Sequence, residues 1–437
     1  DTIRETAAKS PISGNYNGSY LTMTSPSAVE FGILHTLGNF GLVIMDSSYW
    51  QKAYSADVAA AVPGYLLGGV IYFGLPWCLG TVMGLGSLSL QNFPSWPAFG
   101  RELSTTELNA GLILPYSGMA VAGKAGAVAV VIVVFMAVTS TMSAELIAVS
   151  SIISSDVYHT YLKRDASGKQ IMRVSHLACI AFTIVGCAVS VAVYYAGVSL
   201  TWTLYFLGVI TCPGMITMPL TVLWSRQSKV AAIVSPILGL AGGLATWITT
   251  AKKYGNGVVS VETTGLLLPC LWGSVVSTFV PAIFTVILSF TFPTKAFQWE
   301  KFQEIELIDD KSSQNSSLGL DEQEKVSNDS HASYEFSKDL ESPTKPEKLT
   351  PTYDQEKYMR KMSIFSGAAG AFAFLVVWII WPFSMYGTRF EFGPKFLSGW
   401  LVVSVIWVFL GLLVILLLPP FDGRRQITTI IKGVSGR

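Results

Sequence analysis

The sequence is poor in charged residues. Only 13% of its 437 residues are Asp, Glu, Lys or Arg, whereas 51% are hydrophobic. Soluble domains carry about 25% charged residues because their surface faces water. Many of the few charges are concentrated between residues 295 and 361, so the rest of the chain is poorer still. The deficit indicates that most of the protein surface faces lipid.

Features typical of nucleic-acid binding, of metal sites and of enzymes are also missing. The net charge is +1, which gives no electrostatic reason to expect a nucleic-acid partner. The five cysteines lie in or beside apolar runs without metal-ligand spacing, which predicts small buried side chains; they are Cys78, Cys179, Cys187, Cys212 and Cys270. The chain carries no nucleophile-elbow, zinc-protease or phosphate-loop motif. We therefore expect no enzyme, no cofactor and no metal site other than one for sodium.

Long apolar runs are present instead. A bilayer core of about 30 Å needs roughly 20 apolar residues in a helix. Nine segments meet this length, at residues 29–53, 62–88, 120–158, 174–196, 200–224, 230–251, 266–292, 363–386 and 397–418. The sequence therefore predicts an all-α polytopic membrane protein with the lipid bilayer as its surroundings.

The Lys and Arg residues of the loops predict the orientation, because cytoplasmic loops are enriched in them. Alternate loops at 161–173, 226–229, 357–361 and 424–432 are basic, and only Lys252 and Lys253 break the pattern. We expect a plasma-membrane protein with its N-terminus outside and its C-terminus in the cytoplasm.

The same pattern divides the chain into six regions. They are an extracellular N-terminal loop at 1–28, a five-helix core at 29–224, two further spans at 225–292, a cytoplasmic loop at 293–361, two C-terminal spans at 362–419 and a cytoplasmic tail at 420–437. The loop at 293–361 is rich in Ser, Glu, Asp and Lys and too poor in apolar residues to fold alone, which predicts disorder.

The first span carries the most informative polar residues. The block Gly38-Asn39-Phe40-Gly41 near its middle weakens a helix and predicts an interruption at the membrane midplane, where freed backbone groups meet a solute. His35 and Asn39 are four residues apart and share a face, so both are candidates for contacting a small neutral solute. Equally, His35 could be satisfied by a neighbouring carbonyl. Asp46 lies nearer the cytoplasm and is a candidate for proton coupling or for a vestibule.

The third and fifth spans add further candidates. Thr139, Ser140, Thr141 and Ser143 either bond their own helix and pack closely or hold a cation, and their spacing favours packing. Glu145, a mid-span carboxylate, needs a partner, water or a proton, so it is a second proton-coupling candidate. In the fifth span, the run Thr211-Cys212-Pro213-Gly214 predicts a bend. Tyr205, two turns earlier, offers its hydroxyl to a solute or packs against a neighbour.

Three runs, 38–56, 62–85 and 139–158, resemble the urea active transporters of fungi and plants, which belong to the solute:sodium symporter family. The resemblance covers nearly the whole chain except its polar loop. It implies a ten-helix core of two inverted five-helix repeats, of which the first five spans here are the second. It also implies that the chain is N-terminally truncated, without the first repeat.

The resemblance assigns roles to individual residues. Asn39 matches a substrate-contacting amide, and Tyr205 falls where a sugar-transporting relative has a polar contact. Thr139 and Ser140 match a hydroxyl pair that binds sodium, with the carbonyl of Met136 beside them. For these two residues the resemblance therefore implies sodium binding, whereas the spacing alone favours packing. Because the first repeat supplies the other ligands, these are half-sites.

The expected function is secondary active import of urea, with polyamines as a second substrate class, by proton or sodium symport through alternating access. Two other classes remain open: a passive solute channel, and a transporter-like sensor that signals through the cytoplasmic loop.

Overall fold

The computed structural model describes residues 2–56, 58–299 and 353–434. Within these ranges the chain is helical, and nine helical stretches are long and apolar enough to cross a membrane. Each corresponds to one of the nine predicted segments. They cover residues 26–45, 60–90, 113–162, 168–195, 200–223, 229–254, 267–291, 356–387 and 394–421. The prediction of an all-α polytopic membrane protein is confirmed.

The spans are built from helices of uneven length. In chain order the principal ones are α2 (Pro26–Met45), α3 (Ser47–Ser55), α4 (Val58–Leu79), α7 (Ile113–Ser151), α8 (Gly168–Tyr195), α9 (Leu200–Thr211), α10 (Thr217–Leu223), α11 (Lys229–Tyr254), α13 (Leu267–Thr291), α15 (Tyr353–Ala373), α16 (Trp381–Gly387) and α17 (Pro394–Asp422). Wider π-helical turns continue α4, α7 and α15 at Gly80–Leu85, Ile152–Leu162 and Phe374–Ile380.

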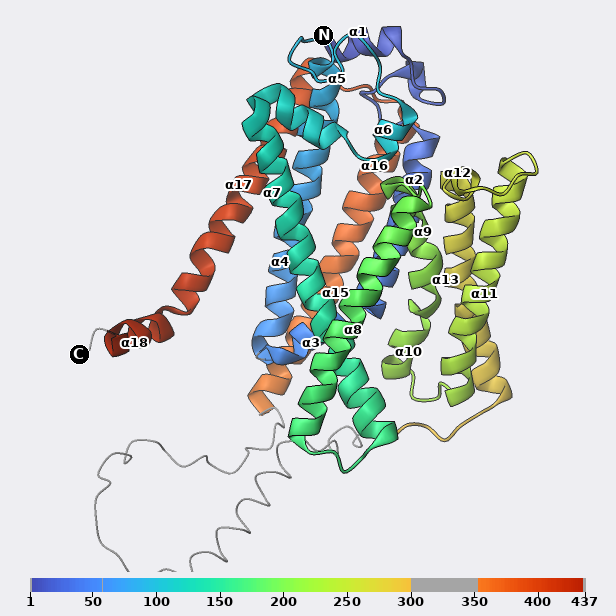
Figure 1. Cartoon of the computed structure of the whole chain (residues 1–437), viewed down its shortest axis with the longest axis vertical. Coiled ribbons are helices and arrows are strands. Elements are labelled where there is room, and N and C mark those ends of the chain that lie inside the picture. Colours follow the sequence, from blue (N-terminus) through green and yellow to red (C-terminus); the bar gives the residue numbers. More distant parts are fainter. Residues whose placement is uncertain (1, 57, 300–352, 435–437) are drawn as a thin grey trace, which may run out of the picture.

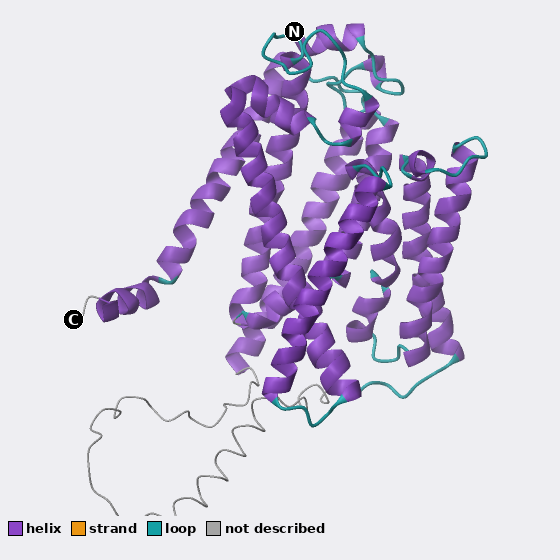
Figure 2. Ribbon diagram, viewed as in Figure 1, coloured by secondary structure: helices purple, strands orange, loops and turns teal. Residues whose placement is uncertain are grey.

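Figures 1 and 2 show the spans side by side, with their connections at two opposite ends. The short helices α1 (Thr2–Lys9), α5 (Gly86–Leu90), α6 (Thr105–Asn109) and α12 (Val261–Thr264) lie at one end. The basic connections before α8 and between α10 and α11 lie at the other end, with the start of α15. Lys252 and Lys253 lead toward α12 at the first end. Three of the four basic segments named in the prediction therefore lie at the same end.

Most of the segment predicted to be disordered, 293–361, lies outside the described residues. Its last part is an exception: α15 begins at Tyr353, so residues 353–361 are helical rather than part of a loop. The Asp354 and Glu356 carboxylates stand in the first turn of this helix, where negative charge favours helix formation.

The closest packing joins α11 to α13 through small residues. A Cβ on Gly239 or Gly243 of α11 would collide with Pro281 or Ser277 of α13. Close backbone approach through small residues is the usual way in which helices associate in lipid. Helix α13 also packs against α2 and α9 and has the largest buried share of the nine spans. It is therefore the centre of the group that contains the candidate substrate residues.

A second group joins α4 to α17 through aromatic side chains. Trp77 of α4 lies edge-on to Trp400 and Trp407 of α17, with ring centroids 5.2 and 5.8 Å apart. The indole N–H of Trp407 donates to the Val70 carbonyl at 2.8 Å, and that of Trp400 to the Thr81 hydroxyl at 3.1 Å. Edge-on aromatic pairs contribute about 0.5–1.5 kcal/mol beyond their buried area. The last span is thus held against the second.

The segment before α2 is tied to the loop before α17. Thr22 and Glu391 form an isolated antiparallel β-bridge. The Phe392 N–H donates to the Leu21 carbonyl at 2.8 Å. These contacts hold the first and last spans together at the end of the bundle that carries α1.

The third span does not begin as one straight helix. Ala122 (φ −129°, ψ 15°) and Gly123 (φ 56°, ψ −139°) leave the helical conformation, and the positive φ suits glycine because it has no Cβ. The reversal brings Gly118 so close to Gly126 that a Cβ on Gly126 would collide with the Gly118 carbonyl. The long part of α7 starts after this turn, close to the predicted start of the span.

Candidate functional site

The predicted interruption of the first span at Gly38-Asn39-Phe40-Gly41 is wrong. Helix α2 runs unbroken from Pro26 to Met45. The two glycines serve helix packing instead: a Cβ on Gly38 would lie 3.3 Å from the Gly208 nitrogen, and one on Gly41 would lie 2.9 Å from the Thr211 carbonyl carbon. The Thr211 hydroxyl also donates to the Gly38 carbonyl at 3.2 Å. The glycines thus let α2 and α9 approach closely while the helix continues.

The first span ends at Asp46. This residue has extended backbone angles (φ −78°, ψ 111°) and separates α2 from α3. Its carboxylate accepts from the Ser48 N–H at 2.8 Å and so caps α3. The Trp50 indole N–H donates to the Ile44 carbonyl at 2.9 Å, which satisfies one of the groups freed at the end of α2.

The fifth span bends where the sequence predicts. Helix α9 ends at Thr211, a 3₁₀ turn covers Cys212–Gly214, and α10 begins at Thr217. Pro213 has no N–H to offer the carbonyl of Val209 four residues earlier. The Ser277 hydroxyl of α13 donates to that carbonyl at 2.9 Å. A hydroxyl of a neighbouring span therefore replaces the missing backbone bond.

The structure brings two predicted substrate residues together. The ring of His35 on α2 lies edge-on to the ring of Tyr205 on α9, with centroids 5.8 Å apart. Phe31 stacks on His35 at 3.9 Å and lies edge-on to Tyr205 at 6.0 Å. Asn39 lies one turn beyond His35 on α2 and is exposed. We call Phe31, His35, Asn39 and Tyr205 the polar–aromatic cluster.

Hydrogen bonding leaves much of this cluster available. His35 Nδ1 lies 3.1 Å from its own helix's Phe31 carbonyl, which leaves Nε2 as the outward nitrogen. Within the described residues, neither the Asn39 amide nor the Tyr205 hydroxyl has a hydrogen-bond partner in the protein. The cluster therefore offers an amide, a phenol and an imidazole nitrogen beside aromatic faces. Phe31 was not among the predicted residues, although its position four residues before His35 places it on the same face.

A second polar grouping joins the two predicted proton-coupling residues. The side-chain carboxyl groups of Asp46 and Glu145 lie close enough to interact electrostatically, although α2 and α7 are far apart in sequence. Two ionised carboxylates at such a separation repel each other, because both carry a negative charge. Lys52 of α3 is the charged neighbour of Glu145, and the Tyr49 phenol lies near both acids. We call Asp46 and Glu145 the carboxyl pair.

The predicted cation residues lie elsewhere on α7. Met136, Thr139 and Ser140 are exposed. The Thr139 hydroxyl donates to the Phe135 carbonyl at 2.8 Å, and the Ser140 carbonyl accepts from Ser143 at 2.9 Å. In the part of the chain that the structure describes, no hydrogen bond joins these residues to another helix.

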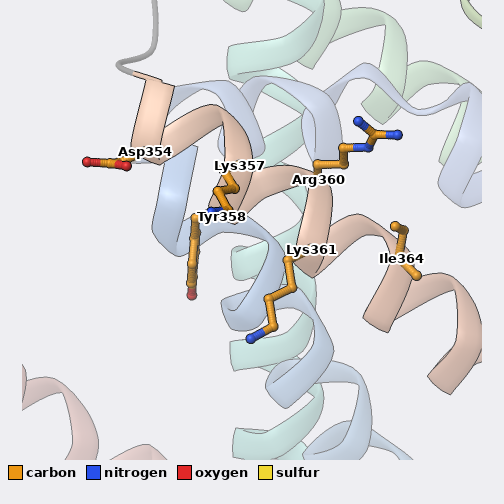
Figure 3. Close-up of a pocket in the computed structure, with 6 residues that line it drawn as sticks. All are labelled: Asp354, Lys357, Tyr358, Arg360, Lys361 and Ile364. Atoms are coloured by element: carbon orange, nitrogen blue, oxygen red, sulfur yellow. The ribbon is translucent and has the colours of Figure 1, made fainter.

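A surface groove lies away from all these residues. It is shallow and is lined by Asp354, Lys357, Tyr358, Arg360, Lys361 and Ile364 at the start of α15. Figure 3 shows the charged side chains spread outward over this helix. None of the predicted solute or ion residues contributes to it.

The fold and the site define a class: a multi-span helical membrane protein with neutral polar groups and an acid pair between its spans. The known proteins that this chain resembles are of the same class. The family model "Sodium:solute symporter family" matches residues 4–239. The chain belongs to the sodium:solute symporter family, whose members couple solute movement to an ion.

Named relatives match along the whole chain. "Probable urea active transporter 1" of Schizosaccharomyces pombe is 35% identical over 100% of this chain and 60% of its own length. "Urea active transporter" of Saccharomyces cerevisiae is 35% identical over 99% of this chain and 63% of its own length. "Urea-proton symporter DUR3" of Oryza sativa is 34% identical over 99% of this chain and 54% of its own length. The chain thus spans less than two thirds of these relatives, and no solved structure matches it.

The packing role of Gly41 gives a test of the unbroken α2. Gly41→Ala places a Cβ 2.9 Å from the Thr211 carbonyl carbon, so α2 and α9 must separate. We expect a loss of about 1–3 kcal/mol, seen as a lower thermal midpoint in detergent. Gly32→Ala on the same helix is the control, because its Cβ meets nothing within 4 Å. Equal midpoints for the two variants would contradict the close contact.

Proposed function

We propose that this chain carries part of the transport core of a proton-coupled urea importer. Three relatives that match it over almost its full length are named urea transporters. The observation that carries the proposal is the polar–aromatic cluster between α2 and α9, because its chemistry suits a small neutral solute. Transport would proceed by alternating access, with the helices rocking around this region.

Urea fits the groups that the cluster offers. It is planar and neutral, with one carbonyl acceptor and two amino groups that donate. The Asn39 amide and the Tyr205 hydroxyl each donate and accept, and His35 adds a ring nitrogen. No carboxylate belongs to the cluster among the described residues, whereas a polyamine cation calls for one. The cluster therefore favours urea over polyamines.

The carboxyl pair supports a proton as the coupling ion. A neutral solute gains nothing from the membrane potential, so its accumulation must be driven by the coupled ion. One elementary charge moved through 100 mV supplies about 2.3 kcal/mol. Asp46 and Glu145 would share a proton at the junction of α2, α3 and α7, because two ionised carboxylates there would repel each other. In the sodium alternative, Met136, Thr139 and Ser140 would supply a half-site on an exposed face of α7.

The basic end of the bundle would face the cytoplasm of a plasma-membrane protein. This end carries Lys163, Arg164, Lys357 and Arg360, and the positive-inside rule assigns such an end to the cytoplasmic side. The carboxyl pair then lies toward the inner side of the membrane, and the N-terminal segment lies outside. No enzymatic step belongs to the proposal.

Uptake of labelled urea tests the function directly. The gene that encodes this chain is expressed in a host without its own urea uptake, and sodium and pH are varied. We expect accumulation that falls as external pH rises, stops with a protonophore and continues when sodium is replaced. Uptake that the protonophore leaves unchanged would indicate a passive channel. A strict need for sodium would move the coupling site to Met136, Thr139 and Ser140.

Substitutions in the cluster test the solute site. Asn39→Ala and Tyr205→Phe each remove one polar partner of urea, and the second keeps the ring contact with His35. Lost hydrogen bonds to a neutral solute cost about 0.5–1.5 kcal/mol, so we expect the half-saturation constant to rise about 2- to 10-fold. The matched control is Tyr195→Phe, whose exposed ring contacts Tyr194 at the end of α8. Unchanged uptake kinetics in both variants would place the solute elsewhere.

Glu145→Gln tests proton coupling separately from solute binding. Glutamine keeps a donor for Asp46 but cannot release a proton. We expect accumulation against a gradient to be lost and the pH dependence to flatten, while exchange of labelled for unlabelled urea continues. Glu262→Gln in α12 is the control and should behave as the unaltered protein. An unaltered pH profile for Glu145→Gln would remove the carboxyl pair from the mechanism.

A further inference from the structure

The last described helix, α18 (Arg424–Val434), has two unlike faces. Ile427, Ile430 and Ile431 recur at the spacing of a single helix face. The sequence of this segment also contains Arg425 and Lys432. From Arg424 onward the sequence contains no Asp or Glu. The helix is therefore amphipathic and basic.

The isoleucine face is not covered by the rest of the described chain. Helix α18 packs against the end of α17. Ile430 and Ile431 nevertheless remain 64% and 60% exposed, and Ile427 is 41% exposed. A contiguous apolar face of this kind on a polar helix marks a surface for a membrane or another partner.

The position of α18 indicates which partner this is. Helix α17 is a membrane span, and the chain turns at Gly423 immediately after it. Figure 1 shows α18 lying crosswise at the end of α17 and leading away from the bundle. The Arg424 guanidinium lies 4.8 Å above the Phe421 ring, at the junction of the two helices. The helix thus begins where the span leaves the hydrocarbon region.

Charge at this end of the protein points to an anionic partner. Lys357, Arg360 and Lys361 are exposed at the start of α15, with Asp354 as an acidic neighbour (Figure 3). Basic residues next to a membrane span are attracted to anionic lipids of the adjacent leaflet. An amphipathic basic helix lies in the interface with its apolar side among the acyl chains.

We propose that α18 is an in-plane helix that binds the anionic phospholipid surface on the basic side of the protein. Its isoleucines insert between the acyl chains, and its basic residues meet the headgroup phosphates and carboxylates. The proposal depends on α17 spanning the bilayer and not on which solute is transported.

Fluorescence of a reporter on each face tests insertion. The full chain, with its five cysteines replaced by alanine, receives Ile430→Cys or Thr429→Cys and an environment-sensitive fluorophore. Each variant is placed in lipid nanodiscs of phosphatidylcholine alone or mixed with phosphatidylserine. We expect a shift to shorter wavelength at position 430, larger with phosphatidylserine, and strong quenching there by lipid-attached nitroxides. Position 429, on the opposite face, should show neither.

Charge reversal tests the preference for anionic lipid. Arg425→Glu with Lys432→Glu should abolish the difference between the two lipid compositions at position 430, and high salt should reduce it. The matched control is Lys252→Glu with Lys253→Glu, which removes the same number of cations from the other end of the bundle. This control should keep the full lipid dependence.

Three results would overturn the proposal. Identical water-like emission at positions 430 and 429 would mean that α18 stays in solution. A shifted emission at position 430 without quenching by lipid nitroxides would mean that protein covers the isoleucines. Insertion that is equal in both lipid compositions would mean that the basic residues do not select anionic lipid.

Discussion

Inside a bilayer no water reaches the backbone, so every departure from helical geometry must be satisfied by the protein itself. The bends of this chain follow that constraint. At Pro213 the freed Val209 carbonyl receives the Ser277 hydroxyl of another span. At Asp46 the carboxylate caps the following helix, and the Trp50 indole serves the preceding one. The positions of these side chains decide where the spans can bend, and the bends in turn position the polar residues between the helices.

The spans and the bend could be predicted because their signal lies in neighbouring residues of the sequence. Apolar runs predicted all nine spans found among the described residues. The Cys212-Pro213-Gly214 run predicted the bend, because proline removes a backbone donor wherever it stands. The prediction failed at Gly38 and Gly41, since glycine weakens a helix but also permits close packing. Only the position of α9, which is set by tertiary contacts, distinguishes the two roles. Likewise, sequence singled out Asp46 and Glu145 separately, but their contact depends on how α3 meets α7.

The two polar groupings occupy different places and have different chemistry. The polar–aromatic cluster lies between α2 and α9 and contains neutral groups, apart from the titratable His35. The carboxyl pair lies at the far end of α2 and joins it to α7. Because α2 belongs to both, the proposed proton on the pair and the proposed solute in the cluster would act on the same helix. A shared rigid element of this kind is the physical requirement for coupling two ligands, since each then biases the same movement.

The β-bridge between Thr22 and Glu391 ties the start of α2 to the segment before α17. Beyond it the helix continues for 20 residues to Asp46, a length of about 30 Å at 1.5 Å per residue. If a helix of that length tilts by about 5° about one end, its other end moves by roughly 2–3 Å. A movement of this size is enough to change the distance between Asp46 at the far end of α2 and Glu145 of α7 markedly. A small rotation at the tied end is therefore amplified into a larger change in the spacing of the carboxyl pair at the other end.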